Sequence, residues 1–221
     1  MVVPVFISGI GTNVGKSVAS ATVCLALQAD YWKPVQAGTE DITDTTWVSD
    51  IIAKDGLNAY KEAYCLAKPA SPHIAAAAEN QRINLEKIVA DLQAIISTID
   101  NGSDQPQYLV IEGAGGLMVP LNETNFIIDL IAALKVPLLL VSRNYLGSIN
   151  HSLLSAAVCR QYKLDVRGWI FNTEYEDYED QIAEWSNMPA LGIIPSLNEF
   201  NYEELKLVAN TIEPALKKAL C

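Results

Sequence analysis

The sequence predicts a doubly wound α/β fold, in which helices cover both faces of a mostly parallel sheet. Short, almost uninterrupted apolar segments alternate with longer amphipathic segments, as they do when buried parallel strands alternate with helices. Glycine and polar residues directly follow the apolar segments, where ligands of such sheets bind. No internal repeat, low-complexity tract or linker divides residues 1–221. We therefore expect one domain.

Five apolar runs are expected to be strands, and five amphipathic runs are expected to be helices. The predicted strands are Val2–Ser8, Tyr108–Glu112, Val136–Ser142, Val166–Asn172 and Leu191–Pro195. In the other runs apolar residues recur with the period of an α-helix. These predicted helices are Ser17–Gln28, Leu85–Ile99, Ile127–Leu134, Asn150–Tyr162 and Tyr202–Leu220.

Composition excludes several classes of protein. Half of the residues are hydrophobic and 19% are charged, which is typical of a globular chain rather than a disordered one. The formal net charge of −11 argues against a general nucleic-acid binder, because phosphate neutralisation needs clustered Lys and Arg. The N-terminal residues lack a basic leader and no apolar run could span a membrane. We expect a soluble, cytoplasmic protein without a membrane partner.

The cysteines give no sign of a metal or redox site. The four of them lie far apart and form no Cys-x-x-Cys pair, which argues against a zinc site or a redox dithiol. They are Cys24, Cys65, Cys159 and Cys221. Reduced thiols are expected, as is usual in the cytosol.

The segment GIGTNVGKS (residues 9–17, hereafter the P-loop) follows the first predicted strand and opens a helix. Backbone N–H groups of a glycine-rich loop and of a helix N-terminus together favour a phosphate. Lys16 can reach the β- and γ-phosphates, and the Ser17 hydroxyl can ligate Mg²⁺. Ile10 occupies the usual first glycine position, and the glycine lies one residue earlier. An incidental turn is the competing interpretation, but the strand–loop–helix context favours nucleotide binding and a P-loop NTPase fold.

Three further charged residues are candidates for the same site. Glu112 ends a predicted strand and begins the glycine-rich segment 112–116, so its carboxylate is expected to face the nucleotide and Mg²⁺. Lys33 follows the short run Ala29–Trp32 and could neutralise phosphate charge, although on the residues alone an ordinary surface lysine fits slightly better. Asp50 lies in an amphipathic helical stretch, where a solvated aspartate is as consistent as a functional one.

Taken together, these segments resemble the dethiobiotin synthetase family. The similarity runs in order along nearly the whole chain, and KPVQ, EGAGG with the VPL turn, and LGSINH are its most specific parts. The matching segments are GIGTNVGKS (9–17), YWKPVQAG (31–38), SD (49–50), PASPHIAA (69–76), EGAGGLMVPL (112–121), LGSINHSLL (146–154), GWIFN (168–172) and IPSL (194–197).

The resemblance implies roles for individual residues. Ser17, Asp50 and Glu112 would bind Mg²⁺, and Thr12, Lys16 and Lys33 would act on the transferring phosphoryl group. The implied ATP-binding residues are Gly11, Thr12, Asn13, Val14, Gly15, Lys16, Ser17, Val18, Glu112, Gly113, Gly115, Asn172, Pro195, Leu197 and Asn198. The implied substrate residues are Lys33, Ala37, Gly115, Gly116, Leu146, Gly147, Ser148 and Asn150.

The implied reaction joins CO₂ to 7,8-diaminononanoate and closes the ring of dethiobiotin at the expense of MgATP. The family also implies a homodimer, in which residues 146–151 of one subunit help to bind the substrate of the other. Two residues depart from the family pattern: Asn13 stands where an acidic residue is frequent, and Ala37 stands where Thr or Ser is frequent. These departures bear on substrate affinity rather than on the class of reaction.

Three other functions remain to be weighed. A partitioning-type dimerising ATPase normally carries an additional lysine near the start of its P-loop, where this chain has Gly9-Ile10-Gly11. An amide-forming relative such as a cobyrinic acid diamide synthase usually has a further glutamine-hydrolysing domain. A nucleotide-binding module without catalysis would not require Lys33, Asp50 and Glu112 together.

Overall fold

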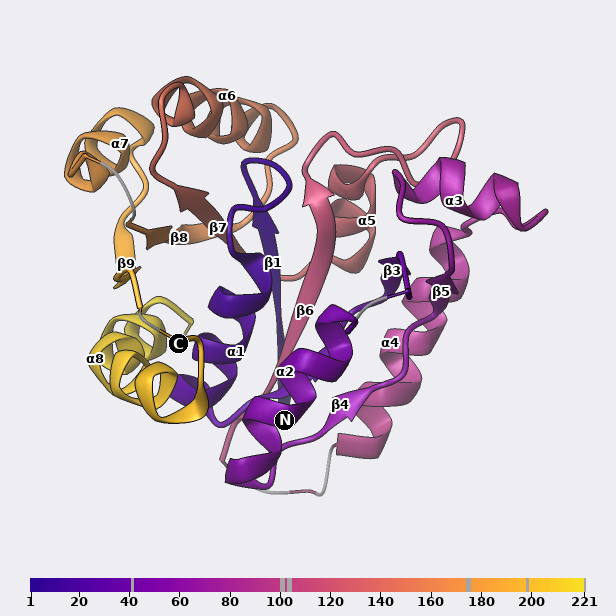
Figure 1. Ribbon diagram of the computed structural model, residues 1–221, viewed down its shortest axis with the longest axis horizontal. Helices are drawn as coiled ribbons and strands as arrows, with labels where there is room; N and C mark the ends of the chain where they lie inside the picture. Colours follow the sequence, from indigo (N-terminus) through magenta and orange to yellow (C-terminus); the bar gives the residue numbers. More distant parts are fainter. Residues whose placement is uncertain (41, 100–101, 103–104, 174–175, 198, 221) are drawn as a thin grey trace.

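The computed structural model, which describes residues 1–40, 42–99, 102, 105–173, 176–197 and 199–220, is organised around a seven-stranded sheet (Figure 1). All strand pairs in this sheet are parallel, in the order β4-β2-β6-β1-β7-β8-β9. Its strands are β1 (Val2–Gly9), β2 (Asp30–Trp32), β4 (Ala59–Tyr60), β6 (Gln107–Gly116), β7 (Leu138–Arg143), β8 (Val166–Asn172) and β9 (Ala190–Ile194). A separate parallel pair joins β3 (Val35–Ala37) to β5 (Tyr64–Leu66).

Helices cover both faces of the large sheet, so the predicted doubly wound α/β class is confirmed. One face packs against α1 (Lys16–Leu27), α2 (Asp44–Ile52) and α8 (Tyr202–Leu220). The other face packs against α4 (Leu85–Ile99), α5 (Ile127–Leu134), α6 (Ser148–Gln161) and α7 (Glu179–Ser186). The short helix α3 (Pro72–Ala78) lies beside β3 and β5, and a 3-10 turn, η1 (Ala53–Asp55), follows α2.

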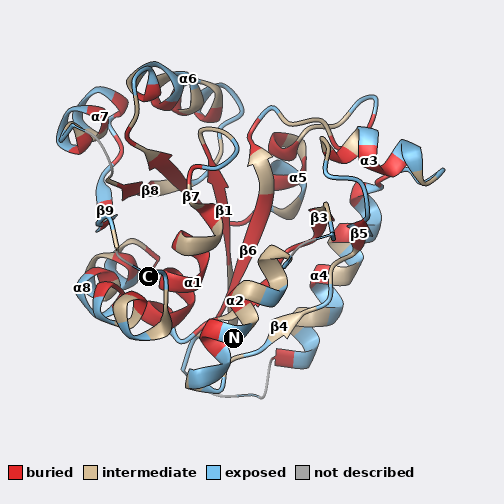
Figure 2. Cartoon of the chain, in the orientation of Figure 1, coloured by how far each residue is buried: buried red, intermediate tan, exposed pale blue. Residues whose placement is uncertain are grey.

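Alternate residues of each strand pack into the two halves of the core, one on each face of the sheet. In β1, Val5 and Ile7 face α1 and α8, whereas Phe6 faces the opposite layer. Because successive strand side chains point to opposite faces, a strand covered on both sides is apolar throughout. The central strands are accordingly buried along most of their length, as the red ribbons of Figure 2 show.

The order of the strands places the P-loop at the point where the winding of the sheet reverses. β1 lies between β6 and β7. The chain leaves β1 toward the β2 side, and after β6 it passes to the β7 side. Loops that leave adjacent strands in opposite directions open a crevice at their carboxyl ends, where ligands of this architecture bind.

Short elements account for most differences from the predicted boundaries. The structure adds strands of two or three residues, β2 to β5, and the helices α3 and α7. The predicted strand Tyr108–Glu112 continues to Gly116, because the segment EGAGG remains paired with β1 up to its last glycine. Helix α6 begins at Ser148, two residues before the predicted start.

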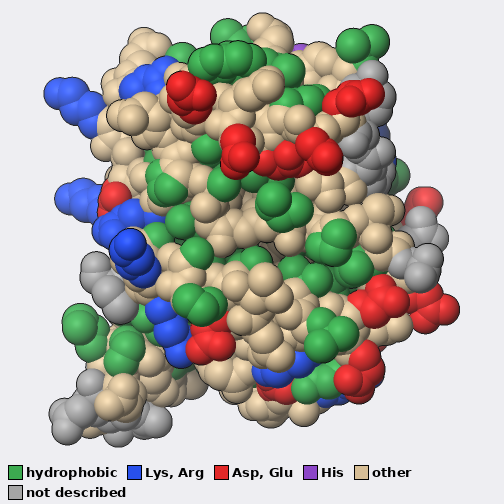
Figure 3. Space-filling view, turned by 90° about the vertical axis from the view of Figure 1, so that its left-hand side faces the viewer, with side chains coloured by type: hydrophobic (Ala, Val, Ile, Leu, Met, Phe, Trp, Pro, Cys, Tyr) green, Lys and Arg blue, Asp and Glu red, His purple; other side chains and the backbone are tan. Residues whose placement is uncertain are grey.

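The surface agrees with the acidic composition. Figure 3 shows the face formed by α7, β9 and α8, on which basic side chains gather mainly toward one side while acidic and apolar side chains occupy much of the rest. Among the helices that the structure describes, none combines the length and hydropathy needed to cross a bilayer. Three cysteines are free thiols, Cys24, Cys65 and Cys159, and Cys221 lies outside the described residues.

A half-buried carboxylate joins the start of α8 to the C-terminal ends of α1 and α2. Asp55 accepts hydrogen bonds from Tyr202 (2.6 Å), Gln28 (2.8 Å) and Lys206. Burial would raise the pKa of Asp55, but these three donors outweigh it and lower the pKa to about 2. A carboxyl group with a lowered folded-state pKa stabilises the fold above its unfolded pKa and loses that contribution as the pH falls toward the folded value.

We expect Asp55→Asn to lower the free energy of unfolding by about 1 to 2 kcal/mol at pH 7. The difference from wild type should shrink between about pH 4 and pH 2, since the wild-type carboxylate is protonated there. Urea denaturation at a series of pH values measures both effects. Asp165→Asn is the matched control, because Asp165 pairs with Arg167 at a side chain that is 56% exposed. An Asp55 variant as stable as this control at pH 7 would refute the assignment.

Candidate active site

The P-loop wraps around the space beyond the carboxyl end of β1. Two residues of the loop have positive φ, Asn13 (57°) and Gly15 (82°). At Gly15 a Cβ would lie 2.4 Å from the Asn172 amide nitrogen, so both the backbone angle and the close approach require glycine. The same amide donates to the Val14 carbonyl at 2.5 Å. Asn172, at the end of β8, therefore holds the P-loop in this conformation through its contacts with Val14 and Gly15.

Lys16 begins α1 and folds back over the loop. Its ammonium donates to the Gly11 carbonyl at 2.9 Å, and the residue is 7% exposed. Burial lowers the pKa of Lys16 to about 8, with the nearby Lys33 acting in the same direction, while Glu112 and Asp44 oppose the change. The charged form is favoured by any anion in the loop, because an opposite charge raises the pKa of an ammonium group.

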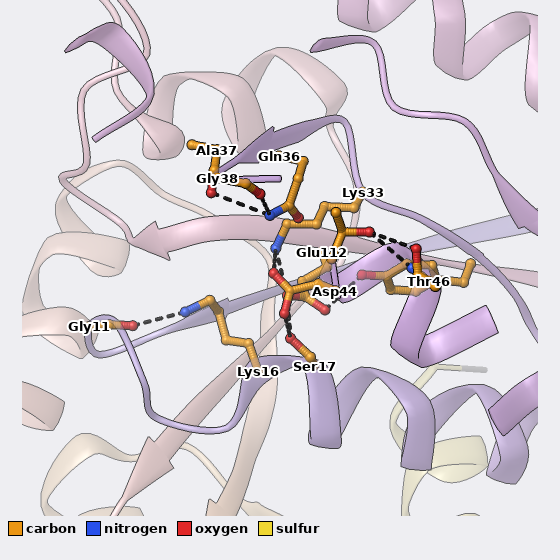
Figure 4. Close-up of polar contacts among 12 residues, drawn as sticks. Gly11, Lys16, Ser17, Lys33, Gln36, Ala37, Gly38, Asp44, Thr46 and Glu112 are labelled. Carbon is orange, nitrogen blue, oxygen red and sulfur yellow. Dashed lines mark hydrogen bonds and ion pairs between the residues drawn. The ribbon is translucent and has the colours of Figure 1, made fainter. Parts of the chain in front are cut away.

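Four polar side chains from four separate segments meet at the end of the P-loop (Figure 4), and we refer to them as the charged cluster: Ser17, Lys33, Asp44 and Glu112. The Lys33 ammonium lies between two carboxylates, 2.7 Å from Asp44 and 2.9 Å from Glu112. The Ser17 hydroxyl is 2.5 Å from Asp44 and 3.0 Å from Glu112. The cluster thus has a hydroxyl, an ammonium and two carboxylates in mutual contact.

The elements that carry the charged cluster explain its assembly. Lys33 directly follows β2, which pairs with β6, the strand that contains Glu112. Asp44 is the first residue of α2, and Thr43 caps that helix by accepting a hydrogen bond from the Thr46 amide at 3.2 Å. A carboxylate in the first turn of a helix is stabilised by the helix dipole. The cap therefore positions Asp44, whose carboxylate contacts the Ser17 hydroxyl.

Charges within the charged cluster compensate one another. Burial would lower the pKa of Lys33, but Glu112 and Asp44 together raise it above its usual value. Burial would raise the pKa of Asp44, yet Lys33 and the Ser17 hydrogen bond hold it below its usual value. Glu112 is fully buried and Lys33 is 4% exposed. Buried charges of this kind persist because they are paired and hydrogen-bonded.

The structure does not bring Asp50 into the charged cluster, contrary to the role that the resemblance implied. Asp50 is exposed and opens onto a separate surface depression that also contains Tyr60 and Glu62. It lies six residues after Asp44 in α2, which rotates its side chain about 120° away around the helix axis and shifts it about 9 Å along that axis. Asp44 occupies the place beside Ser17.

The donor set of the charged cluster fits Mg²⁺ bound together with nucleotide phosphates, rather than a metal ion bound by protein side chains alone. Among the described residues, no group of three His, Cys, Asp or Glu side chains is placed to hold a metal ion. Mg²⁺ in nucleotide sites is bound by one or two carboxylates and a hydroxyl, with phosphate oxygens and water completing the shell. The side chains of Ser17, Asp44 and Glu112 are placed so that they could supply these protein ligands.

Two adjoining cavities extend from the P-loop. The larger, of about 610 Å³, contains the charged cluster together with Thr12, Ala37 and Gly115. The smaller, of about 230 Å³, is lined by the other side of the P-loop and by Arg143, Asn172, Pro195 and Phe200. Both cavities contact Asn13, Gly15 and Val18. Their arrangement suits a nucleotide with phosphates in the large cavity and a base in the small one.

The remaining residues implied by the resemblance are only partly gathered at these cavities. Gly113 and Gly116 lie in β6 next to β1, and Leu197 packs on the core near the smaller cavity. Asn198 lies outside the described residues. The segment from Leu146 to Asn150 lies before and within the start of α6 and lines neither cavity. Within it Ser148 is buried, whereas Leu146, Gly147 and Asn150 are exposed.

Two residues of the site, Asp44 and Tyr31, were not predicted from the sequence. Asp44 follows Thr43 in the typical pattern of a capped helix start, and this signal was available. Tyr31 donates its hydroxyl proton to the Glu112 carboxylate at 2.9 Å. It lies two residues before Lys33, so strand alternation directs both side chains to one face of the sheet. Burial, and then Glu112, raise the pKa of Tyr31 well above its usual value.

Solved structures of low sequence identity share this fold. The septum site-determining protein MinD of Pyrococcus horikoshii, complexed with Mg-ADP, superposes with a TM-score of 0.57 at 14% identity over 99% of this chain and 97% of its own. A chain of the MinC:MinD cell division protein complex of Aquifex aeolicus gives a TM-score of 0.60 at 11% identity over 98% of this chain and 96% of its own. These similarities confirm the predicted fold class.

Sequence comparison places the chain within one family. Residues 4–204 match the family model described as an AAA domain. The ATP-dependent dethiobiotin synthetase BioD of Afipia carboxidovorans is 41% identical over 201 residues, 90% of each chain. That of Christiangramia forsetii is 38% identical over 217 residues, 98% of this chain and 97% of its own. The chain belongs to the ATP-dependent dethiobiotin synthetase family.

Proposed function

We propose that this protein catalyses the MgATP-dependent conversion of 7,8-diaminononanoate and CO₂ to dethiobiotin, with release of ADP and phosphate. The observation that carries the proposal is the charged cluster beside the P-loop. Lysines and a metal-binding carboxylate pair surround one cavity, as phosphoryl transfer to a carboxylate-like acceptor requires. Family membership identifies the acceptor as the carbamate of a diamine.

In the proposed mechanism, one amine of the substrate captures CO₂ and loses a proton to form a carbamate. A carbamate oxygen then attacks the γ-phosphorus of ATP, the bond from that phosphorus to the β–γ bridging oxygen breaks, and ADP leaves. The resulting carbamic–phosphoric anhydride has a good leaving group. The second amine attacks its carbonyl carbon and loses a proton, phosphate departs, and the cyclic urea closes. No covalent bond to the protein is needed.

The protein's part in these steps is positioning and charge neutralisation. Ser17, Asp44 and Glu112 would hold Mg²⁺, which would supply positive charge to the phosphates of ATP. Lys33, which pairs with both carboxylates in the structure, would then be free to turn toward the carbamate and the transferring phosphoryl group. Lys16 would leave the Gly11 carbonyl for the phosphates, and Thr12 at the mouth of the large cavity would contact the same group.

The base of ATP is proposed to occupy the small cavity. The ends of β8 and β9 form its floor through Asn172 and Pro195, and the aromatic ring of Phe200 borders it. An aromatic ring that borders a cavity can stack on a nucleobase bound there. The P-loop residues that contact both cavities would lie along the ribose and the phosphates.

We further propose that the protein is a homodimer in which the segment 146–151 completes the substrate site of the partner. In this chain Leu146 is 89% exposed and Leu154 of the same region is 56% exposed. The N-terminus of α6 would favour a substrate carboxylate through the helix dipole, although the Ser148 N–H already donates to the Tyr145 carbonyl at 2.9 Å. Residues 146–150 line neither of the two cavities of their own subunit, although His151 borders a third cavity with Thr12 and Gly116. A second subunit would supply residues 146–150. A cytoplasmic location accords with the soluble substrates.

Fixation of labelled bicarbonate tests the proposed reaction. Purified protein with MgATP and 7,8-diaminononanoate is expected to convert label into acid-stable product, with one phosphate released for each label retained. Omission of the diamine should abolish both signals, because ATP is consumed only after a carbamate has formed. ATP turnover that is indifferent to the diamine, without retained label, would contradict the proposal and favour a partitioning-type ATPase switch. That alternative has the shared fold in its favour, but the chain lacks its additional P-loop lysine.

A further inference from the structure

A tyrosine hydroxyl in the protein core is bonded to one oxygen of Glu112. Tyr31 donates to Glu112 Oε2 at 2.9 Å. The other oxygen, Oε1, accepts from Ser17 at 3.0 Å and from Lys33 at 2.9 Å. Both Tyr31 and Glu112 are fully buried. The two oxygens of one carboxylate are therefore divided, with Oε2 held by the core and Oε1 presented to the charged cluster.

The pairing of β2 with β6 explains this contact. Tyr31 lies opposite Val110 in the parallel register. Alternate residues of a strand share a face, so Glu112 projects to the same side as Val110 and lies diagonally across from Tyr31. The tyrosine ring packs in the cluster of apolar residues under α1, together with Val110 and Ile7. Packing around a fully buried ring leaves the hydroxyl little freedom to leave Glu112.

We propose that Tyr31 is a positioning residue that makes Glu112 a one-oxygen ligand to the metal of the proposed reaction, a statement that rests on the proposed function. A carboxylate can bind a cation through one oxygen or through both. Mg²⁺ is small and demands near-octahedral geometry, whereas Ca²⁺ accepts bidentate carboxylates at longer distances. By occupying Oε2, Tyr31 favours the smaller ion and fixes the direction of Oε1. Partners of this kind orient metal ligands in many proteins.

The chain offers a closely matched pair of variants. Tyr31→Phe removes one hydroxyl group and keeps the ring. In the neighbouring strand β4, the Tyr60 hydroxyl donates to Asp30 Oδ2, also at 2.9 Å. Tyr60→Phe therefore deletes the same type of hydrogen bond in the same sheet, and neither Tyr60 nor Asp30 lines the large cavity of the charged cluster. A difference between the two variants reports on Glu112 rather than on the loss of a tyrosine–carboxylate bond in general.

Metal binding to the full chain with ADP is the decisive measurement, since it needs neither diamine nor turnover. Electron paramagnetic resonance of Mn²⁺ gives its affinity, and competition with Mg²⁺ and Ca²⁺ gives the preference between them. Tyr31→Phe should weaken Mn²⁺ and Mg²⁺ binding about tenfold and raise the relative affinity for Ca²⁺. Binding of ADP in the presence of a chelator should stay unchanged. Tyr60→Phe should match wild type in all three measurements.

The role of Tyr31 is contradicted if Tyr31→Phe lowers the melting temperature but leaves metal affinity and the Mg²⁺ to Ca²⁺ preference at wild-type values. That outcome would mean that the hydroxyl only stabilises a buried carboxylate. If Tyr31→Phe is not recovered as folded protein, Tyr31→Met supplies a second apolar residue without a donor and is judged by the same criteria. Failure of the proposed function is distinguishable, because it would abolish diamine-dependent fixation in wild type while the metal measurements still separated the two tyrosine variants.

Discussion

Replacement of Lys33 by alanine is expected to reduce kcat for label fixation about 10³-fold, the size of effect associated with removing a group that stabilises transition-state charge. Lys33 is the buried ammonium nearest both carboxylates of the charged cluster, and the proposed mechanism moves it to the transferring phosphoryl group. KM for ATP should change much less, since the P-loop amides and Lys16 remain. Steady-state assays of label incorporation and phosphate release measure both parameters.

Lys218→Ala is the appropriate control for this variant, because Lys218 is exposed in the last turn of α8. It should retain wild-type kinetics. A Lys33→Ala enzyme with kcat within tenfold of wild type would remove Lys33 from the reaction and make it a structural counter-ion. The contrast separates the loss of a particular ammonium group from the loss of one positive charge in a protein of net charge −11.

The same substitution has a predicted effect on stability. Without Lys33, the carboxylates of Glu112 and Asp44 face each other, and leaving buried charge unpaired is costly. We expect Lys33→Ala to lose about 2 kcal/mol at pH 7 in the absence of Mg²⁺, less than for a fully buried pair because the Asp44 side chain is 39% exposed. Lys33 holds the pKa of Asp44 below its usual value. The pairing therefore stabilises the fold fully above the pKa of Asp44 in the unfolded chain, and this stabilisation is lost as the pH falls through the lower folded-state pKa. Denaturation at pH 7 and at acid pH measures this difference.

The parts of the fold that could be predicted from sequence are those in which a local pattern decides the structure. Strands such as β1 and β7 are apolar along most of their length because helices cover both faces. The P-loop between β1 and α1 could be located because its glycines and its Lys-Ser pair both contribute to phosphate binding. Elements of two or three residues, such as β2 and β4, contain too few residues to show a period. Pairing with a neighbouring strand creates them.

The site could be predicted only where its residues follow a strand or the P-loop. Glu112 and Lys33 lie at strand ends, and the structure brings both into the charged cluster. Asp44 depends on where a helix begins and how it is capped, whereas the metal role implied by the resemblance falls on Asp50, later in the same helix. Tyr31 depends on the register between β2 and β6, which connects residues about eighty positions apart. No local sequence pattern contains that register.

A second pair of variants decides between the two aspartates of α2. Asp44→Asn is expected to lower kcat about 10²-fold and to raise the Mg²⁺ concentration needed for half-maximal activity, because Asp44 contacts both Ser17 and Lys33. Asp50→Asn should stay within twofold of wild type, since its side chain faces a separate surface depression. The two variants change the same residue type in the same helix, which makes each the control for the other. Steady-state kinetics at several Mg²⁺ concentrations give both quantities. A severe defect confined to Asp50→Asn would restore the assignment implied by the resemblance, and it would require α2 to rotate about its axis when MgATP binds.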